Sequence, residues 1–290
     1  MSLYDALRAA AAHLAQAGIP TPDADAVELA SFVLDVEPSE VRRRLVVRAE
    51  LPAAQADRLA ELVGERAHRI PLQHLTGRAY FRHLTLQVGP GVFVPRPETE
   101  VVAGLAIDAA RAAGPAPLVV DLCTGSGAIA LAIAQEVPSA QVLAVELSPL
   151  AVAWARRNIE ALALPVELRH ADATTAFSEL TGAVDVVVSN PPYVPTGQVP
   201  IDPEVRDHDP EIALYGGSAD GLAIPVAVAA QAARLLRAGG TLVMEHADAQ
   251  GDSLPARLRA SGDWEHVADH LDLTGRPRAT VARRADPAAS

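Results

Sequence analysis

The stretch LVVDLCTGSG, Leu118–Gly127, decides the fold that this sequence predicts. Five residues that are apolar except for one aspartate indicate a buried strand, and the glycines that follow let the chain turn tightly into a helix. In sheets with helices on both faces, such a loop lies at the carboxyl end of a strand, where backbone amides can approach a ligand. The stretch therefore predicts an α/β sheet with a nucleotide-type binding loop.

Strands and helices alternate from this loop toward the end of the chain. Ser148 and Pro149 are favourable as the N-cap and first residue of one of these helices. Further strands are expected at Gln141–Leu147, Val166–His170, Val184–Ser189, Thr241–His246, Trp264–Leu271 and Arg278–Arg283. With Leu118–Leu122 they predict a doubly wound sheet of seven strands, the last two antiparallel.

The first part of the chain has a different period. Leu3, Leu7 and Leu14 recur at helical spacing, and Thr21-Pro22-Asp23 is a typical helix start. We expect a small all-α bundle over residues 1–75.

An extended segment follows the bundle. Apolar and polar residues alternate over Leu84–Val88, Gly89-Pro90-Gly91 is a turn sequence, and Val92–Val94 is again apolar. We therefore expect a β-hairpin whose turn is at Gly89–Gly91. The expected organisation is a helical domain at 1–75, a hairpin linker at 76–97, a sheet domain at 98–284 and a tail at 285–290.

Composition and charge argue against several classes of protein. The chain of 290 residues has a formal net charge of −12, which repels phosphate backbones, so we expect no direct binding of nucleic acid. Its apolar runs are too short to cross a bilayer and its start lacks the pattern of a signal peptide, so we expect a cytoplasmic protein without membrane contact. A single cysteine and nine histidines without a ligand spacing predict no bound metal.

The expected strand Gln141–Leu147 carries a carboxylate near its end. A doubly wound fold places such a residue, here Glu146, where it can accept hydrogen bonds from both hydroxyls of a ribose. The G-x-G-x-x-G spacing of dinucleotide sites is absent, and the chain has no lysine for a P-loop, so a phosphate-poor adenosine ligand is favoured. The alternative is that Gly125 and Gly127 only permit the turn and Glu146 is a solvated strand end.

The strand Val184–Ser189 leads to Asn190-Pro191-Pro192-Tyr193, the most specific motif of the chain, at the same edge of the sheet as the glycine loop. The prolines make the backbone rigid and leave carbonyls that no local amide can claim, while Asn190 offers a side-chain oxygen and Tyr193 a flat ring. Such a site can hold a planar NH2 group. The alternative, that the prolines only form a rigid exit from the strand, does not explain the neighbouring adenosine site.

Five segments of the chain resemble the motifs of one known family. They are Pro71–Gly77 (PLQHLTG), Phe93–Glu100 (FVPRPETE), Asp121–Gly127 (DLCTGSG), Asn190–Tyr193 (NPPY) and Gly216–Leu222 (GGSADGL). Over nearly the full length they are similar to the release factor glutamine methyltransferases, known as PrmC or HemK. The resemblance implies a Rossmann-like, seven-stranded class I methyltransferase domain, preceded by an all-α bundle and a β-hairpin linker.

The resemblance also implies a reaction. It is transfer of a methyl group from S-adenosylmethionine to the side-chain amide nitrogen, N5, of the glutamine in the Gly-Gly-Gln motif of peptide chain release factors, which supports translation termination and leaves S-adenosylhomocysteine. The residues implied in catalysis and substrate binding are Asn190, Pro191, Pro192 and Tyr193, with Arg96 and Glu98 as further substrate-binding candidates. The cofactor-binding candidates are Asp121, Cys123, Thr124, Gly125, Ser126, Gly127, Glu146, Asp172, Ala173 and Asn190.

Cys123 departs from the family pattern, which has a glycine at this position. A Cβ there restricts the backbone angles and adds bulk near the methionine end of the cofactor, so affinity for the cofactor is the property affected. The thiol could be reactive, or it could be a small packed side chain, which is the commoner behaviour of a free cysteine.

We expect catalysis to depend mainly on positioning, because the nitrogen lone pair of an amide is delocalised into the carbonyl. In this hypothesis, the Asn190 side-chain oxygen and the Pro191 carbonyl accept both N–H bonds of the glutamine and stabilise the positive charge that grows on nitrogen. Tyr193 packs against the amide plane. No general base is expected, because the N-protonated product loses its proton readily, even to water.

Three other functions fit parts of the pattern. A DNA adenine methyltransferase would present a flipped base to the same motif, but the net charge and the lack of a basic recognition helix argue against it. An enzyme for a glutamine of a ribosomal protein would share every catalytic motif, and a silent cofactor-binding adaptor is disfavoured by the intact Asn190–Tyr193.

Because a pocket for one amide cannot select one glutamine among thousands, we expect residues 1–75 to supply a separate docking surface.

Overall fold

The computed structural model of the protein describes residues 1–286, so residues 287–290 of the predicted tail lie outside the described part. The described chain forms two compact units. The helical unit consists of Met1–Arg78, Val88–Pro90 and Pro200–His208, and the sheet unit consists of Ala79–Gln87, Gly91–Val199 and the chain from Asp209 onward. Among the described residues, no helix has the length and apolar character needed to cross a membrane.

The helical unit confirms the predicted bundle. Its helices are α1 (Leu3–Gln16), α2 (Pro22–Leu34), α3 (Pro38–Val46), α4 (Ala53–Ala67), α5 (Leu72–Thr76) and α9 (Pro203–His208). The Ser2 hydroxyl caps α1 by accepting a hydrogen bond from the Asp5 N–H, and α2 and α3 begin with prolines, whose fixed φ suits the first helical position. The apolar faces of α1, α2 and α4 share one buried core.

Buried charges attach α9 to the helices from the start of the chain. Arg66 of α4 donates from Nε to Asp25 of α2 at 2.7 Å and from Nη1 to Glu204 of α9 at 2.6 Å. Arg69 also donates to Glu204, at 2.5 Å. Burial opposes the charge on Glu204, but its hydrogen bonds, those from Arg66 and Arg69 among them, lower the pKa of the carboxyl to about 2. A segment that follows the Asn190 motif by only a few residues is therefore part of the helical unit.

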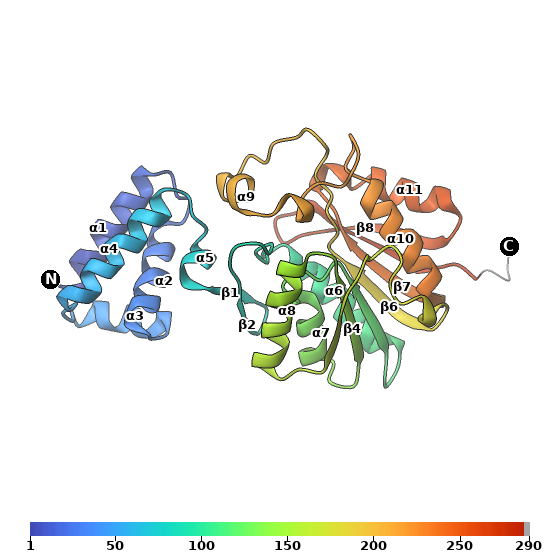
Figure 1. Cartoon of the computed structure of the whole chain (residues 1–290), viewed down its shortest axis with the longest axis horizontal. Coiled ribbons are helices and arrows are strands. Elements are labelled where there is room, and N and C mark those ends of the chain that lie inside the picture. The colour runs from blue at the N-terminus through green and yellow to red at the C-terminus, as the bar shows by residue number, and fades with distance from the viewer. Residues whose placement is uncertain (287–290) are drawn as a thin grey trace. The chain divides into compact units, whose positions relative to one another are not determined.

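The sheet unit confirms the predicted α/β fold (Figure 1). Its large sheet has the strand order β5-β4-β3-β6-β7-β9-β8, in which β3 to β7 are parallel and β9 is antiparallel to both neighbours. The strands are β3 (Leu118–Leu122), β4 (Gln141–Glu146), β5 (Val166–His170), β6 (Val184–Ser189), β7 (Leu236–Glu245), β8 (Trp264–Leu271) and β9 (Pro277–Arg284). The helices are α6 (Thr99–Ala113), α7 (Ala128–Glu136), α8 (Pro149–Leu162), α10 (Ala223–Leu235) and α11 (Ser253–Ser261).

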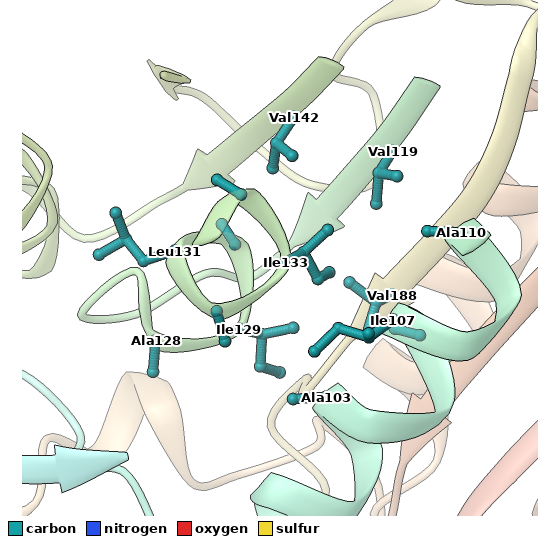
Figure 2. Close-up of a cluster of buried hydrophobic side chains, with 14 of the residues drawn as sticks. Ala103, Ile107, Ala110, Val119, Ala128, Ile129, Leu131, Ile133, Val142 and Val188 are labelled. Carbon is teal, nitrogen blue, oxygen red and sulfur yellow. The ribbon is translucent and has the colours of Figure 1, made fainter. Parts of the chain in front are cut away.

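Side chains alternate between two helical layers along the strands. On β3, Val119 packs with α6 and α7, whereas Val120 and Leu122 belong to the core that α10 and α11 cover. Figure 2 shows the first of these cores, in which Ile107 of α6 and Ile133 of α7 lie beneath the strands. The apolar residues of α7 are buried on all sides, so the helix that follows the glycine loop is firmly held.

The hairpin exists, but its predicted turn at Gly89–Gly91 is wrong. Its strands are β1 (Arg78–Phe81) and β2 (Leu84–Gln87), and Val92–Val94 forms no strand. The turn is at Arg82, which has a φ of +53° although it is not a glycine. Its N–H donates to Glu100 and its guanidinium pairs with Glu136, so tertiary contacts stabilise a backbone conformation that the local sequence does not indicate.

Candidate active site

Four neighbouring strands end at one edge of the large sheet with residues that the sequence singles out. β3 leads to Cys123–Gly127, β4 ends at Glu146, β5 leads to Asp172 and Ala173, and β6 leads to Asn190–Tyr193. Because these strands are parallel and adjacent in the order β5-β4-β3-β6, their carboxyl ends share this edge. The strand order reverses around β3, which is where α/β folds bind their ligands.

Asp121 at the end of β3 is fully buried and shapes the glycine loop. Its Oδ2 accepts hydrogen bonds from the Thr124 hydroxyl at 2.6 Å and from the Ala130 N–H at 3.2 Å, which ties the loop to the start of α7. Burial raises the pKa of this carboxyl to about 7, although both hydrogen bonds oppose the shift. Within the described part of the chain, Oδ1 accepts no hydrogen bond.

Glu146 holds the other side of the loop. One carboxylate oxygen accepts the Gly125 N–H, and the other accepts those of Leu147 and Ser148, all at 2.8 Å. The side chain is only half-buried, and Oε2, which accepts a single bond, keeps further acceptor capacity. A Cβ added at Gly125 would meet no atom within 4 Å. The loop therefore has open space beside it and a carboxylate oxygen able to accept a bond from a hydroxyl group.

Asp172 and Ala173 begin the loop after β5. The Asp172 carboxylate accepts hydrogen bonds from the N–H and the hydroxyl of Thr174, at 2.8 and 2.7 Å, while Ala173 is buried. These contacts stabilise the turn after the strand. A role for either residue at the adenine stays a prediction.

Cys123 has a left-handed backbone conformation, which favours glycine, the residue that the family has at this position. Its φ is +66°, and the side chain is half-buried. Burial, followed by the nearby carboxylates of Glu146 and Asp121, raises the pKa of the thiol. The thiol therefore stays protonated, which fits a packed side chain better than a reactive one.

We expect Cys123→Gly to stabilise the protein by about 1 kcal/mol, because a residue with a Cβ is strained at positive φ. Ala163, at a φ of +51° at the end of α8, offers a matched control, and Ala163→Gly should give a similar gain. Urea unfolding of both variants measures the change. A loss of stability in Cys123→Gly alongside a gain in Ala163→Gly would contradict this explanation.

The Asn190 motif is held by side chains from other elements. The Ser189 hydroxyl donates to the Leu122 carbonyl at 2.6 Å and joins the ends of β6 and β3. Asn190 donates from Nδ2 to the Thr99 hydroxyl oxygen at 3.4 Å, which leaves its Oδ1 as the acceptor. The Tyr193 hydroxyl donates to Glu245 Oε1 at 3.3 Å. The orientation of both side chains thus depends on residues outside the motif.

The segment Gly216–Leu222 supports the backbone of the same loop. The Val194 N–H donates to the Leu214 carbonyl at 2.7 Å, and the Gly216 N–H donates to the Val194 carbonyl at 2.9 Å. Gln250 donates from Nε2 to the carbonyls of Tyr193 and Asp220, at 2.9 and 2.8 Å. A motif that the sequence connects only with the family therefore has a structural role beside the site.

We expect Gly221→Ala to lower kcat about 10- to 100-fold, since its Cβ would overlap the Tyr193 carbonyl oxygen and lie 2.9 Å from Gln250 Nε2. Gly275 has the same left-handed backbone, at φ +81°, with no atom within 4 Å of an added Cβ. Gly275→Ala is therefore the control for backbone strain alone. Equal kcat values for the two variants would show that the overlap with Tyr193 is not important.

Arg96 and Glu98 precede α6, and Arg96 has a clear structural partner. Arg96 donates to Asp209 at 2.7 Å, and the Asp209 side chain is 1% exposed. The guanidinium also lies 5.2 Å from the centroid of the Phe93 ring. Glu98 is the N-cap residue of α6 but makes no capping hydrogen bond with its side chain. Substrate binding by Arg96 and Glu98 stays a prediction.

Two buried polar residues lie beside the motif: Glu245 was not predicted, whereas Thr99 belongs to the segment Phe93–Glu100, which the family resemblance places beside the site. Glu245 is the last residue of β7, and Thr99 is the first residue of α6. A carboxylate at the carboxyl end of a buried strand is the signal that identified Glu146, and it could have identified Glu245 as well.

In the part of the chain that the structure describes, no group of His, Cys, Asp or Glu is suited to hold a metal ion.

Comparison with protein families matches both parts of the chain. A model of the PrmC N-terminal domain matches residues 5–77, and a model of the methyltransferase small domain matches residues 86–202. The second match contains the glycine loop, Glu146 and the Asn190 motif.

Curated relatives are similar over nearly the whole chain. The release factor glutamine methyltransferase of Streptomyces coelicolor is 54% identical over 277 residues, 94% of this chain and 95% of that protein. The protein of the same name from Bifidobacterium longum is 47% identical, with 96% and 98% covered. The 4-amino-L-phenylalanine/4-methylamino-L-phenylalanine methyltransferase of Streptomyces pristinaespiralis is 42% identical, with 92% and 90% covered.

Proposed function

Because this chain belongs to the release factor glutamine methyltransferase family, we propose that it methylates peptide chain release factors, with S-adenosylmethionine as donor. The acceptor atom is the side-chain amide nitrogen, N5, of the glutamine in their Gly-Gly-Gln motif. The observation that supports this most is the glycine loop after β3 beside Asn190–Tyr193 after the adjacent strand β6. Methyl transfer to nitrogen requires the methyl donor and the NH2 group to be held close together, and this arrangement places a binding loop for the donor next to hydrogen-bond acceptors for the NH2 group.

The loop residues fit S-adenosylmethionine, which supplies an electrophilic methyl group when bound. The open space at Gly125 admits a ligand close to the backbone, and Oε2 of the half-buried Glu146 can accept a further bond from a ribose hydroxyl. Asp172 and Ala173 would border the adenine. Residues 123–127 would contact the methionine part, with Asp121 holding the loop in shape.

The Asn190 motif would hold the acceptor amide. Asn190 Oδ1 and the Pro191 carbonyl accept the two N–H bonds, and their partial negative charges stabilise the positive charge that develops on nitrogen. Pro192 keeps the backbone rigid, and the Tyr193 ring packs on the amide plane. The proton leaves to water after methyl transfer, so no side chain of the site has to act as a strong base.

Selection of one glutamine requires contacts beyond this pocket. We assign them to the helical unit, which has its own buried core and includes the segment Pro200–His208. That segment follows the Asn190 motif in the sequence. The loop that holds the amide therefore continues along the chain into a part of the helical unit. The glycines that flank the target glutamine would let it extend into the pocket.

A second candidate is methylation of the amino group of a small aromatic amine. The relative named for 4-amino-L-phenylalanine favours it, because that protein is 42% identical over 92% of this chain. An aromatic NH2 group offers Asn190 and Pro191 the same two donors.

Transfer of a labelled methyl group tests the two candidates together. The enzyme is incubated with labelled S-adenosylmethionine, an intact release factor, a short Gly-Gly-Gln peptide and 4-amino-L-phenylalanine, each as the sole acceptor. We expect the highest kcat/KM with the intact factor, since only this acceptor can contact the helical unit. A higher kcat/KM for the free amine would favour the second candidate, and equal values for peptide and factor would refute recognition by the helical unit.

A further inference from the structure

A buried carboxylate connects the side chains of Asn190 and Tyr193. Glu245 is 2% exposed, and its Oε1 accepts the Tyr193 hydroxyl at 3.3 Å. A hydrogen-bonding interaction with Thr99 lowers the pKa of the same carboxyl, although Oε2 accepts no hydrogen bond of full geometry from the described residues. Asn190 in turn donates to Thr99 at 3.4 Å. Tyr193 therefore contacts the carboxylate directly, and Asn190 is connected to it only through Thr99 at the start of α6.

The hydrogens of this cluster can be arranged in only one fully satisfied way when Glu245 is ionised. A carboxylate only accepts, so the Tyr193 hydroxyl donates to it, and the Thr99 hydroxyl can bond to it only as a donor. Thr99 has a single hydroxyl hydrogen, and once this points to Glu245, its oxygen is an acceptor. The Asn190 amide must then turn its NH2 group toward Thr99 and its oxygen away from it.

We propose that Thr99 and Glu245 are positioning residues for methyl transfer: Glu245 orients the Thr99 and Tyr193 hydroxyls, and Thr99 fixes the Asn190 amide with Oδ1 toward the substrate NH2 group. The proposal rests on the proposed function of Asn190 as acceptor for that group. A rotated Asn190 would present its own NH2 group to the substrate NH2 group, two donors facing each other.

The charge of Glu245 should therefore control the rate. Burial raises the pKa of this carboxyl to about 7, with Glu98 before α6 acting in the same direction, whereas Thr99, Arg278 of β9 and Tyr193 lower it. Protonation turns one of the two carboxylate oxygens into a donor, so the Thr99 and Tyr193 hydroxyls no longer have one ionised oxygen each to donate to. The ionised form is the orienting one, so kcat should rise as the pH increases through about 7.

Variants of Thr99 test the positioning of Asn190. Thr99→Val keeps the shape and removes the hydroxyl, and we expect kcat to fall about tenfold or more, with KM and cofactor affinity little changed. Thr99→Ser should restore kcat to within about threefold of the unchanged enzyme. Thr280→Val is the matched control, because Thr280 is also fully buried and its hydroxyl has no hydrogen-bond partner among the described residues. Combined with Asn190→Ala, Thr99→Val should cause no additional loss.

Glu245→Gln tests the charge. Glutamine puts an NH2 donor in the place of one carboxylate oxygen and does not titrate, so kcat should fall about tenfold and lose its rise near pH 7. All assays use the acceptor that the unchanged enzyme methylates faster, either the release factor or 4-amino-L-phenylalanine. The test of positioning therefore does not depend on whether the proposed substrate is correct. An unchanged kcat in Thr99→Val, additive losses with Asn190→Ala, or the same pH profile in Glu245→Gln would overturn the proposal. Weakened cofactor binding in Thr99→Val that Thr99→Ser does not restore would do the same.

Discussion

Replacing Asn190 with alanine is expected to lower kcat for methyl transfer about 100- to 1,000-fold, because the variant loses an acceptor that interacts most strongly with the transition state. The ground-state amide gains less from the same hydrogen bond, so the KM for the release factor should change much less than kcat. Single-turnover assays at saturating cofactor measure the methyl-transfer step itself.

Gln141→Ala is a suitable control for this experiment. Gln141 has a similar side chain, but it is exposed at the start of β4, at the opposite edge of the sheet from the site. Its replacement should leave kcat unchanged. If Asn190→Ala stays within a few fold of the unchanged enzyme, the side-chain oxygen does not carry the chemistry that we assign to it.

Replacing Arg66 with methionine is expected to destabilise the helical unit by about 3–5 kcal/mol. The variant keeps a side chain of similar length but leaves Asp25 and Glu204, 5% and 9% exposed, without their shared partner. Hydrogen exchange of residues 200–208 and of α4 reports the change, because α9 loses one of its two arginine contacts.

Arg43→Met is the matched control on the same bundle. Arg43 pairs with Glu40 at 2.7 Å, but its side chain is 77% exposed, so its replacement should change the stability of the helical unit much less than Arg66→Met does. Equal protection of residues 200–208 in the two variants would contradict the assignment of these residues to the helical unit.

The contribution of Glu204 to stability should also depend on pH. Its carboxyl has a pKa of about 2 in the folded protein, against 4.5 for a free side chain, so the unfolded chain takes up the proton first as the pH falls. The stabilisation is fully present above pH 4.5 and is lost as the pH falls toward 2. Arg66→Met should weaken this dependence, because it removes one cause of the lowered pKa.

Much of the fold could be predicted because the preferences of the local sequence agree with the tertiary structure. The run Val184–Ser189 is apolar enough to be buried on both faces, and it is a strand with the same bounds in the structure. The Ser148 hydroxyl caps α8, and Pro149 is its first residue, as their positions in the sequence predict. The glycine loop and the Asn190 motif meet because parallel strands present their carboxyl ends at one edge.

The errors and omissions arise where distant residues decide the structure. Arg82 adopts a left-handed turn that Glu100 and Glu136 stabilise, and its neighbours give no indication of it. Glu204 is a buried ion-pair partner of Arg66, which lies 138 residues away in the sequence. Thr99 lies in a segment that the family resemblance highlights, but its contact with Asn190 depends on the packing of α6.

Neither the sequence nor the motif distinguishes a glutamine amide from an aromatic amine. Asn190 and Pro191 offer acceptors to any planar NH2 group, and the rest of the acceptor must be recognised elsewhere. The identity of the substrate therefore depends on the helical unit more than on the catalytic loop.

Mass spectrometry of a purified release factor, after incubation with this enzyme and S-adenosylmethionine, decides whether glutamine is the acceptor. We predict the mass of one methyl group on the glutamine of the Gly-Gly-Gln motif, and no added mass when that glutamine is replaced by alanine. An incubation of the same length with the Asn190→Ala enzyme should methylate only a small fraction of the factor. Methylation of another residue of the factor, or an unmodified factor under conditions in which 4-amino-L-phenylalanine is methylated, would contradict the proposed function.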